Sequence, residues 1–397
     1  MKLLFIQGGS RWKRDTEGNL YTDANFTEEI WGRYRRYSEH LTVILRGEEM
    51  IYSVEEAQRR FNYFDSAISS AICLPDVYKP PTRNFNLKLR RRINLAIKEA
   101  VAASDAVIIR SVGNIYTNSA LKWVRKLKKP YLVEVTGFAF ESLWYHSFKG
   151  KIVALVNELQ TKVLMKDVPY AVYVTNEALQ KRYPCAGKAV GCSDVEVFAP
   201  QDSILEQRLQ KINAKSKGDK IILGTAAFLD VGWKGQKYVI HALSELKKKG
   251  ITNLEYQLIG AGNGKELIHE AQLYGVEQSV TIQGALPHEK VFEWMDHIDI
   301  YIQPSFMEGL CRSIVEAMSR ACPVICSNVG GNYELVDKEY LFHKGDSKDL
   351  VCKIELLMKQ KNMLVCASRN FNKSKEYEKN ILDNKRNVFF ENFFKEV

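Results

Sequence analysis

The residues whose types and spacing best suit chemistry are two glutamates, Glu308 and Glu316, in the segment PSFMEGLCRSIVEAM at 304–318. If the spacing is helical throughout, eight residues separate the two carboxylates by roughly 12 Å. Carboxylates so far apart cannot share a proton as a close acid pair does, but each can accept charge-assisted hydrogen bonds from two hydroxyl groups. This separation suits an extended ligand with hydroxyls at both ends, such as a nucleotide-sugar, although two glutamates at a fixed spacing are by themselves a weak pattern. The alternative is an exposed glutamate pair on a surface helix.

The same segment predicts a strand at 299–303, a loop, and a helix over 309–320. The free N–H groups and the dipole at the start of a helix attract anions. Open α/β sheets also bind their ligands at the carboxyl ends of strands. The amides that we expect to face a phosphate are those of Gly309, Leu310, Cys311 and Arg312.

Other predicted strands end in loops with glycine or lysine. Lys234, in the loop GWKG at 232–235, can neutralise a diphosphate, and the alternative is an ordinary surface lysine. Gly284 and Leu286 lie in a loop after a predicted strand at 279–283. The glycines at 260, 262 and 264 lack the G-x-G-x-x-G spacing of a dinucleotide site, so no such site is expected.

The first half offers weaker candidates. Gly8 and Gly9 follow a predicted strand at 2–7, where glycine permits close approach of a ligand to the backbone or forms an ordinary strand-end turn. Arg110 ends a predicted strand at 106–110, as either an anion contact or a solvated strand end.

Short runs rich in Val, Ile, Leu and Tyr alternate with longer helical patterns along the whole chain, which predicts parallel sheets in two α/β domains. The polar segment 200–219 interrupts this rhythm, and we expect the domain boundary there. A final helix is expected over 375–397, and its aromatic residues must pack against another part of the protein. The predicted strands are 2–7, 41–46, 106–110, 131–135, 171–175, 188–192, 220–226, 255–260, 279–283, 299–303 and 323–327.

The composition agrees with two or three folded domains and excludes a disordered chain: of 397 residues, 46% are hydrophobic and 11% aromatic. No apolar run approaches the roughly 18 residues of a membrane span, and the N-terminal run is too short for a secretory signal. We therefore expect a cytoplasmic protein. The eight cysteines form no C-x-x-C pair and are interpreted as reduced thiols, with no metal site.

The formal net charge of +10 is uneven, because residues 1–200 carry +9 and residues 201–397 carry +1. Basic residues cluster at 88–92 and 122–129. Such clusters are typical of a solvated helix face, and they also suit an anionic membrane surface or a phosphate-rich substrate. No nucleic-acid-binding motif accompanies them, so we expect no nucleic-acid partner.

Taken in order over 224–331, these features resemble the retaining GT-B glycosyltransferases of family 4. The residues that carry the resemblance are Gly224, Lys234-Gly235, Gly260-x-Gly262, Gln283-Gly284-x-Leu286-Pro287, Glu308-x7-Glu316 and Gly330-Gly331. The resemblance implies two facing Rossmann-like domains with parallel sheets and a C-terminal helix that crosses back to the first domain. It assigns 1–200 to the acceptor, 201–375 to the nucleotide-sugar donor and 376–397 to the crossover helix.

The resemblance also implies roles for single residues. Glu308 contacts the donor sugar, Glu316 the ribose and Lys234 the diphosphate, while Gly284 and Leu286 border the base. In the first domain, Gly8 and Gly9 approach the donor phosphates, and His146, in the loop after the strand at 131–135, lies near the reacting sugar.

The implied activity is retaining, metal-independent transfer of a sugar to a hydroxyl, with a UDP-sugar as the favoured donor. The implied acceptor is a cell-surface polysaccharide or its lipid-linked precursor, reached peripherally at the inner face of the cell membrane. No Asp-x-Asp cluster is present to hold a divalent ion, and no cofactor is expected.

One departure from the family pattern leaves alternatives open. Many members carry an arginine five or six residues before the diphosphate lysine, where this chain has Leu229 and Phe228. Compensating charge must come from elsewhere, with Arg312 as a candidate. The alternatives are a catalytically silent partner subunit that binds a nucleotide-sugar, or a nucleotide-sugar epimerase on the same fold.

Overall fold

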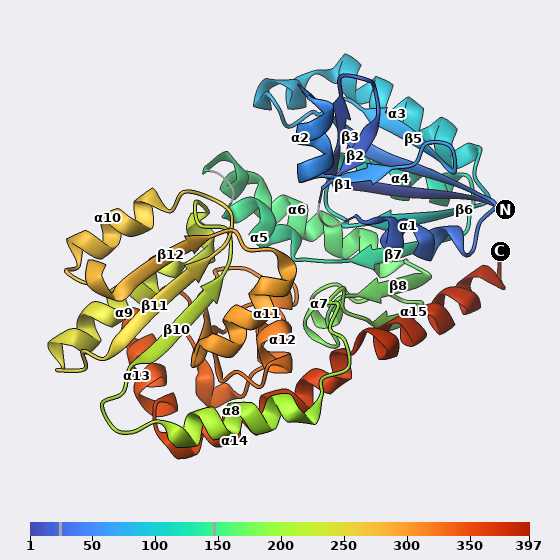
Figure 1. Cartoon of the computed structure of the whole chain (residues 1–397). Coiled ribbons are helices and arrows are strands. Elements are labelled where there is room, and N and C mark those ends of the chain that lie inside the picture. The colour runs from blue at the N-terminus through green and yellow to red at the C-terminus, as the bar shows by residue number, and fades with distance from the viewer. Residues whose placement is uncertain (24–25, 146–147) are drawn as a thin grey trace.

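The computed structural model describes residues 1–23, 26–145 and 148–397. In this part of the chain the main strands form two separate sheets, each accompanied by helices (Figure 1). The predicted α/β fold with two parallel-sheet domains is confirmed.

The first sheet is built around β1, whose alternate residues enter two different cores. Leu3 and Phe5 join one hydrophobic cluster, while Leu4 and Ile6 join another, so the sheet is buried on both faces. Its strands are β1 (Lys2–Asp15), β2 (Leu20–Thr22), β3 (His40–Tyr52), β4 (Asn62–Phe64), β5 (Ser69–Leu74), β6 (Ala106–Arg110), β7 (Tyr131–Val135), β8 (Tyr170–Tyr173) and β9 (Lys188–Gly191).

Parallel pairing gives the order β5-β3-β1-β6-β7-β8-β9, and β2 and β4 add an antiparallel extension to the far half of β1. The order reverses between β1 and β6, which is the topological switch point where such sheets bind ligands. The helices of this domain are α1 (Glu28–Arg35), α2 (Val54–Arg60), α3 (Leu87–Ala102), α4 (Ile115–Lys126), α5 (Ala139–Trp144), α6 (Phe148–Lys166) and α7 (Ala178–Arg182).

The second sheet has the order β12-β11-β10-β13-β14-β15, and every neighbouring pair is parallel. Its switch point lies between β10 and β13. The strands are β10 (Ile221–Ala226), β11 (Leu254–Ile259), β12 (Val280–Gly284), β13 (Ile300–Gln303), β14 (Val324–Ser327) and β15 (Leu341–Phe342). The helices are α8 (Asp202–Ala214), α9 (Gln236–Lys248), α10 (Lys265–Leu273), α11 (His288–His297), α12 (Arg312–Ser319), α13 (Ser347–Leu357) and α14 (Gln360–Ser374). The strands predicted in this half are confirmed to within about two residues, whereas the short β15 carries too weak a pattern to be predicted.

The polar segment 200–219 contains a helix that belongs to the second sheet's domain. Helix α8 packs against α14, and the buried Arg208 donates to the carbonyl oxygens of Met295 and Ile298, at 2.6 Å each. The guanidinium therefore satisfies backbone acceptors next to β13 and fixes α8 there.

The final helix, α15 (Lys379–Phe394), leaves the second domain and packs on the first, as expected (Figure 1). Phe394 stacks on Tyr37 with ring centroids 4.8 Å apart, and Phe393 meets Tyr170 edge-on at 5.2 Å. At the start of the crossing, Val197 pairs with Glu378 in a parallel bridge, and the Lys379 amide donates to the Val197 carbonyl at 2.8 Å. The two segments that connect the domains are thus hydrogen-bonded to each other.

Candidate active site

Lys234 and Glu308 form an ion pair at the carboxyl edge of the second sheet. Lys234 Nζ lies 2.7 Å from Glu308 Oε1, and Gln303 Nε2 donates to the same oxygen at 3.3 Å. Both charged side chains are only about one-seventh exposed, at 15% and 13%. Lys234 Nζ also lies 4.5 Å from the centre of the Trp233 ring. The site therefore holds a positive charge that a diphosphate can reach by displacing the glutamate.

The topology brings these two residues together, because their loops follow neighbouring strands. Lys234 ends a short 3-10 turn after β10, and Glu308 lies in the loop after β13, which pairs with β10. Gly235 follows Lys234 with a φ of +76°, and a Cβ there would lie 2.1 Å from the Pro304 carbonyl oxygen. Only glycine permits this approach of the two loops.

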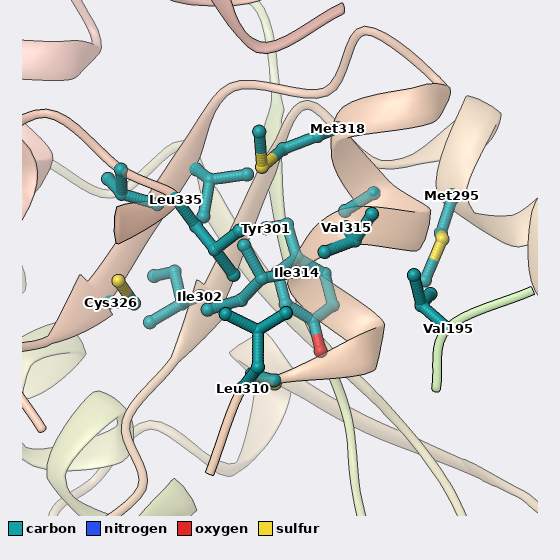
Figure 2. Packing of buried hydrophobic residues seen from close by; sticks show 14 of the residues in the cluster. Val195, Met295, Tyr301, Ile302, Leu310, Ile314, Val315, Met318, Cys326 and Leu335 are labelled. Atoms are coloured by element: carbon teal, nitrogen blue, oxygen red, sulfur yellow. The ribbon is translucent and has the colours of Figure 1, made fainter. Parts of the chain in front are cut away.

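The start of α12 points into the space between the domains. Ile314, Val315 and Met318 are fully buried against Tyr301 and Ile302 of β13, which fixes the direction of the helix (Figure 2). The side chains of Leu310 and Cys311 are buried in this packing, so these two residues can offer a ligand their backbone amides but little of their side chains. Burial also raises the pKa of the Cys311 thiol, which keeps it protonated.

A cavity of about 280 Å³ lies on the Glu308 side of this helix start. Its walls come from both domains: Trp233, Glu308 and Gly309 face Ser111, Thr136 and Glu141, among others. A Cβ on Gly309 would lie 2.5 Å from the Thr136 carbonyl oxygen, so the domains approach closely here and glycine is required.

A second cavity, of about 330 Å³, lies on the Glu316 side. Thr136 lines both cavities, so they adjoin at the end of β7. Arg312 and Glu316 line it from α12, and Gln7 and Arg110 line it from the first sheet's switch point. The two glutamates therefore face neighbouring compartments of one cleft.

No continuous helix joins the two glutamates, so the condition for a separation of roughly 12 Å is not met. Helix α12 begins at Arg312, so Glu308 precedes it and belongs to the loop. The reason is that the backbone of Glu308 and Gly309 packs against the glycine loop after β14, in the same domain. A Cβ on Gly330 would lie 1.9 Å from the Glu308 carbonyl oxygen, and the Gly331 amide donates to the Gly309 carbonyl at 2.8 Å.

Arg110 is not a solvated strand end. Its guanidinium donates to Glu134 at 2.5 Å and to Asp194 at 2.6 Å, and its side chain is only 13% exposed. Arg33 and Arg386 also approach Asp194, at 3.9 and 3.4 Å. Burial alone would raise the pKa of the Asp194 carboxyl, but the three guanidinium charges outweigh it and lower that pKa well below 3.8. Arg110 thus lines the cavity with its charge already shared between two carboxylates.

Gly8 and Gly9 do not form a turn at the end of a strand, and the predicted end of the strand at Gln7 is wrong. Strand β1 continues through them to Asp15, with a shift in its pairing to β3 between Ile6 and Arg11. Gly8 is buried, and a Cβ there would lie 2.0 Å from Asn114 Oδ1. Its lack of a side chain therefore accommodates Asn114, the N-cap of α4, while the neighbouring Gln7 lines the cavity.

Two further expected residues, Gly284 and Leu286, line neither of the two cavities. Gly284 ends β12 with a φ of +77°, and the half-buried Leu286 packs against the core of the second domain. His146 lies outside the described residues.

Several residues of the cleft escaped the sequence analysis. His288, the first residue of α11, has its Nε2 4.0 Å from Glu316 Oε1, and the nearby Glu316 carboxylate raises the pKa of the imidazole above 6.5. His288 lies two residues after Leu286, directly after a loop that the sequence marks as a candidate, and this proximity is a signal that could have identified it. Asp194 follows a predicted strand but has no distinguishing motif.

Glu334 makes a contact across the domains that the sequence does not indicate. Its carboxylate accepts hydrogen bonds from three successive amides at the start of α7, those of Asn176, Glu177 and Ala178, at 2.7, 3.1 and 2.7 Å. A negative charge at a helix N-terminus is favourable. This contact latches the second domain to the first beside the cleft.

We predict that Glu334→Gln loosens the closed arrangement, because the variant loses the charge and can satisfy fewer amides. Hydrogen bonds to charged groups contribute about 1.5–3 kcal/mol, so the equilibrium constant for closure is expected to fall at least about tenfold. Small-angle scattering would detect the larger radius of gyration. Glu339→Gln, an exposed neighbour, is the control, and an unchanged scattering profile for Glu334→Gln would rule out the latch.

Two Rossmann-like domains whose switch points face each other across a cleft define the GT-B architecture. The family model for glycosyl transferases group 1 matches residues 206–376. The chain is 32% identical to Protein CapJ of Staphylococcus aureus over 398 residues, which covers 98% of this chain and 91% of that protein. The chain therefore belongs to the group 1 glycosyltransferases, and the resemblance seen in its residues is confirmed.

Two further comparisons add to this picture. The chain is 27% identical over 105 residues to the capsular polysaccharide biosynthesis glycosyltransferase CapH of Staphylococcus aureus, across 26% of this chain and 29% of that protein. Its fold is similar to that of Anabaena HepE in complex with UDP-glucose, with a TM-score of 0.63 and 16% identity over the whole of both chains. In the described part of the chain, no helix combines the length and apolar character needed to span a membrane.

Proposed function

We propose that this chain is a retaining, metal-independent glycosyltransferase that moves a sugar from a nucleotide-diphosphate-sugar to an acceptor hydroxyl. The observation that carries the proposal is the Lys234–Glu308 ion pair of 2.7 Å, whose Glu308 lines the 280 Å³ cavity between the domains. In this proposal residues 201–375 bind the donor, residues 1–200 bind the acceptor, and residues 376–397 tie the two domains together.

The donor extends along the start of α12. Its sugar lies in the 280 Å³ cavity, where Glu308 accepts hydrogen bonds from the sugar hydroxyls. Its diphosphate lies against the backbone amides of 309–312 and replaces Glu308 as the ion-pair partner of Lys234. Its ribose lies in the 330 Å³ cavity, where Glu316 accepts hydrogen bonds from the ribose hydroxyls and His288 lies beside it.

Cleavage of the glycosidic bond develops negative charge on the leaving diphosphate. Lys234 and the amides at the start of α12 are already in place to stabilise it, which is electrostatic catalysis by preorganised donors. The acceptor hydroxyl attacks the same face of the sugar, and the departing phosphate oxygen takes its proton. This route requires neither a separate carboxylate base nor a divalent ion.

The missing upstream arginine has a structural counterpart. Leu229 and Phe228, which stand at the arginine positions, have uncharged side chains, so neither supplies charge to the diphosphate. Arg312 lines the 330 Å³ cavity at the start of α12 and is placed to supply this charge.

The shared architecture with HepE, whose complex holds UDP-glucose, supports a UDP-sugar as the donor. The likeness to CapH supports an acceptor that belongs to a cell-surface polysaccharide or its lipid-linked precursor. The proposed reaction takes place in the cytoplasm, at the inner face of the cell membrane.

A donor screen tests this proposal. Nucleotide release from UDP-, GDP- and ADP-sugars is measured for the natural chain, with UDP-sugars expected to react. Glu316→Ala is expected to raise the donor KM about 10- to 100-fold, since hydrogen bonds to a charged group contribute about 1.5–3 kcal/mol. Glu289→Ala, at an exposed glutamate on the neighbouring α11, is the control and should leave the KM unchanged.

Two results would contradict the proposal. Tight nucleotide binding without release from any donor would identify a silent partner subunit. Conversion of the donor into its epimer, without transfer, would identify an epimerase.

A further inference from the structure

Helix α6 of the first domain buries polar side chains and exposes apolar ones, the opposite of an ordinary surface helix. Its polar residues Glu158 and Thr161 are buried, at 3% and 0% exposure. Glu158 is fully engaged there, because it accepts from Arg182 Nε at 2.5 Å and from the Tyr183 hydroxyl at 2.6 Å. The residues turned toward solvent are apolar: Ile152 (71% exposed), Leu155 (60%), Val156 (65%), Leu159 (57%) and Val163 (69%).

The spacing of these five residues places them on one side of α6, as a continuous apolar stripe. Contiguous exposed apolar surface of this kind marks a surface that binds a partner. The inward hydrogen bonds of Glu158 hold the helix in this orientation. The stripe is therefore a fixed feature of the domain surface.

Cations flank the stripe on the neighbouring helices α3 and α4. Lys98, Lys122 and Lys126 surround the Trp123 ring, with Nζ atoms 5.2, 5.4 and 5.5 Å from its centre. Arg90 and Arg91 are exposed on the same pair of packed helices. An apolar stripe beside cations and a tryptophan suits an anionic bilayer, whose surface attracts lysine and arginine while its interior accepts apolar side chains.

A cavity of about 620 Å³ lies between the same three helices. Its lining combines cations that suit a phosphate with apolar side chains that suit a hydrocarbon chain. These are Arg90, Arg91 and Lys122, together with Leu87, Val153 and Val156. A phosphate-bearing lipid has both chemical parts.

The cavity leads toward the active site. Gly113 lines it, while the preceding residues Ser111 and Val112 line the 280 Å³ cavity of Glu308. Likewise, Leu143 lines the 620 Å³ cavity, while the preceding Ser142 lines the 280 Å³ cavity. Adjacent residues of the loop after β6 and of helix α5 thus separate the two spaces.

We propose that the membrane face, defined as the α6 stripe together with Arg90, Arg91, Lys98, Lys122 and Lys126, docks on an anionic bilayer. The cavity that opens between its helices takes the phosphate-bearing end of a lipid-linked acceptor and directs its sugar toward Glu308. The acceptor role rests on the proposed function, whereas the docking does not.

Vesicle binding of the full chain tests the docking. The chain is expected to sediment with vesicles of phosphatidylcholine mixed with phosphatidylglycerol and to dissociate from them when salt is added. It is not expected to bind vesicles of phosphatidylcholine alone. Replacing Ile152, Leu155 and Leu159 by Gln should weaken binding about 100-fold, because each side chain loses its apolar contact with the bilayer. The matched control replaces Ile268, Leu273 and Val365, which are exposed apolar residues of the second domain, by Gln.

Equal vesicle binding by the α6 variant and the control variant would overturn the docking. A dimer in solution that the α6 variant abolishes, without vesicle binding by the natural chain, would also overturn it, since the stripe would then join two copies. Nucleotide release without acceptor should be unchanged in the α6 variant. Vesicle binding by a chain that releases no nucleotide from any donor would defeat the proposed function and leave the docking intact.

Farnesyl diphosphate, a soluble isoprenoid diphosphate, probes the cavity. Gln160→Trp fills the cavity mouth from an exposed position on α6 without changing charge. The variant should keep its vesicle binding and lose at least about tenfold in affinity for farnesyl diphosphate, because the bulky ring occupies the space of the chain. Equal affinity in both proteins, or no saturable binding to the natural chain, would overturn the assignment of the cavity.

Discussion

Lys234→Gln is expected to lower kcat for nucleotide release by about 100- to 1000-fold, the usual effect of removing one preorganised donor from a developing negative charge. The effect should be large because the lysine is mostly buried and already oriented by Glu308 at 2.7 Å. In the transition state the leaving diphosphate carries more charge than in the bound donor, so the loss should fall on kcat more than on KM.

The measurement is steady-state release of nucleotide from the preferred donor. Lys237→Gln is the matched control, since it removes the same charge three residues along the chain from an exposed side chain. A kcat equal to that of Lys237→Gln would exclude Lys234 from the reaction. A rise in KM alone would restrict Lys234 to binding of the donor.

Asp194→Asn is expected to lower the free energy of unfolding by about 2–3 kcal/mol at neutral pH. Removing one partner of a buried ion pair leaves the opposite charge uncompensated, which costs about 3–5 kcal/mol in a fully buried site. Asp194 is 23% exposed, so the lower value is appropriate. Arg110, Arg33 and Arg386 all lose part of their compensation in this variant.

The same carboxylate predicts how stability depends on pH. Since the folded pKa of Asp194 is lowered, its contribution is complete above the ordinary value of 3.8 and is lost as the pH falls from there through the folded pKa. Chemical unfolding at a series of pH values should show less acid destabilisation in Asp194→Asn than in the natural chain. Asp167→Asn, at an exposed aspartate, is the control. Parallel stability profiles for the natural chain and Asp194→Asn would contradict the assignment.

The fold of the second domain could be predicted from the sequence because its signals are local. Its strands are short and are followed by glycine-containing loops, and all but the edge strands β12 and β15 are largely buried. The first domain was harder to predict, since β1 passes through Gly8 and Gly9 and continues as a strand. A glycine pair after an apolar run indicates a turn, and only the packing of Asn114 against Gly8 shows why the chain stays extended.

The residues of the candidate site also differ in whether they could be predicted from the sequence. Lys234 and Glu308 could be assigned to one site from the sequence, because the family resemblance places both of them on the donor. Asp194 and Glu334 could not, since their partners come from distant elements or from the other domain. Helix α6 shows a third case. Its apolar stripe predicts burial, and only the buried Glu158 shows that the stripe faces outward.

The paired crossings between the domains determine how the molecule can move. The chain passes between the domains once before α8 and once before α15, and the bridge between Val197 and Glu378 ties the two passages together. Two tethered passages act as a single pivot, so opening and closing reduce to rotation about one axis. The latch at Glu334 engages the first domain at the start of α7. Each closure therefore returns Glu308 to the same place opposite Thr136, and in the proposed function the axis of this hinge sets the angle at which the acceptor meets the donor sugar.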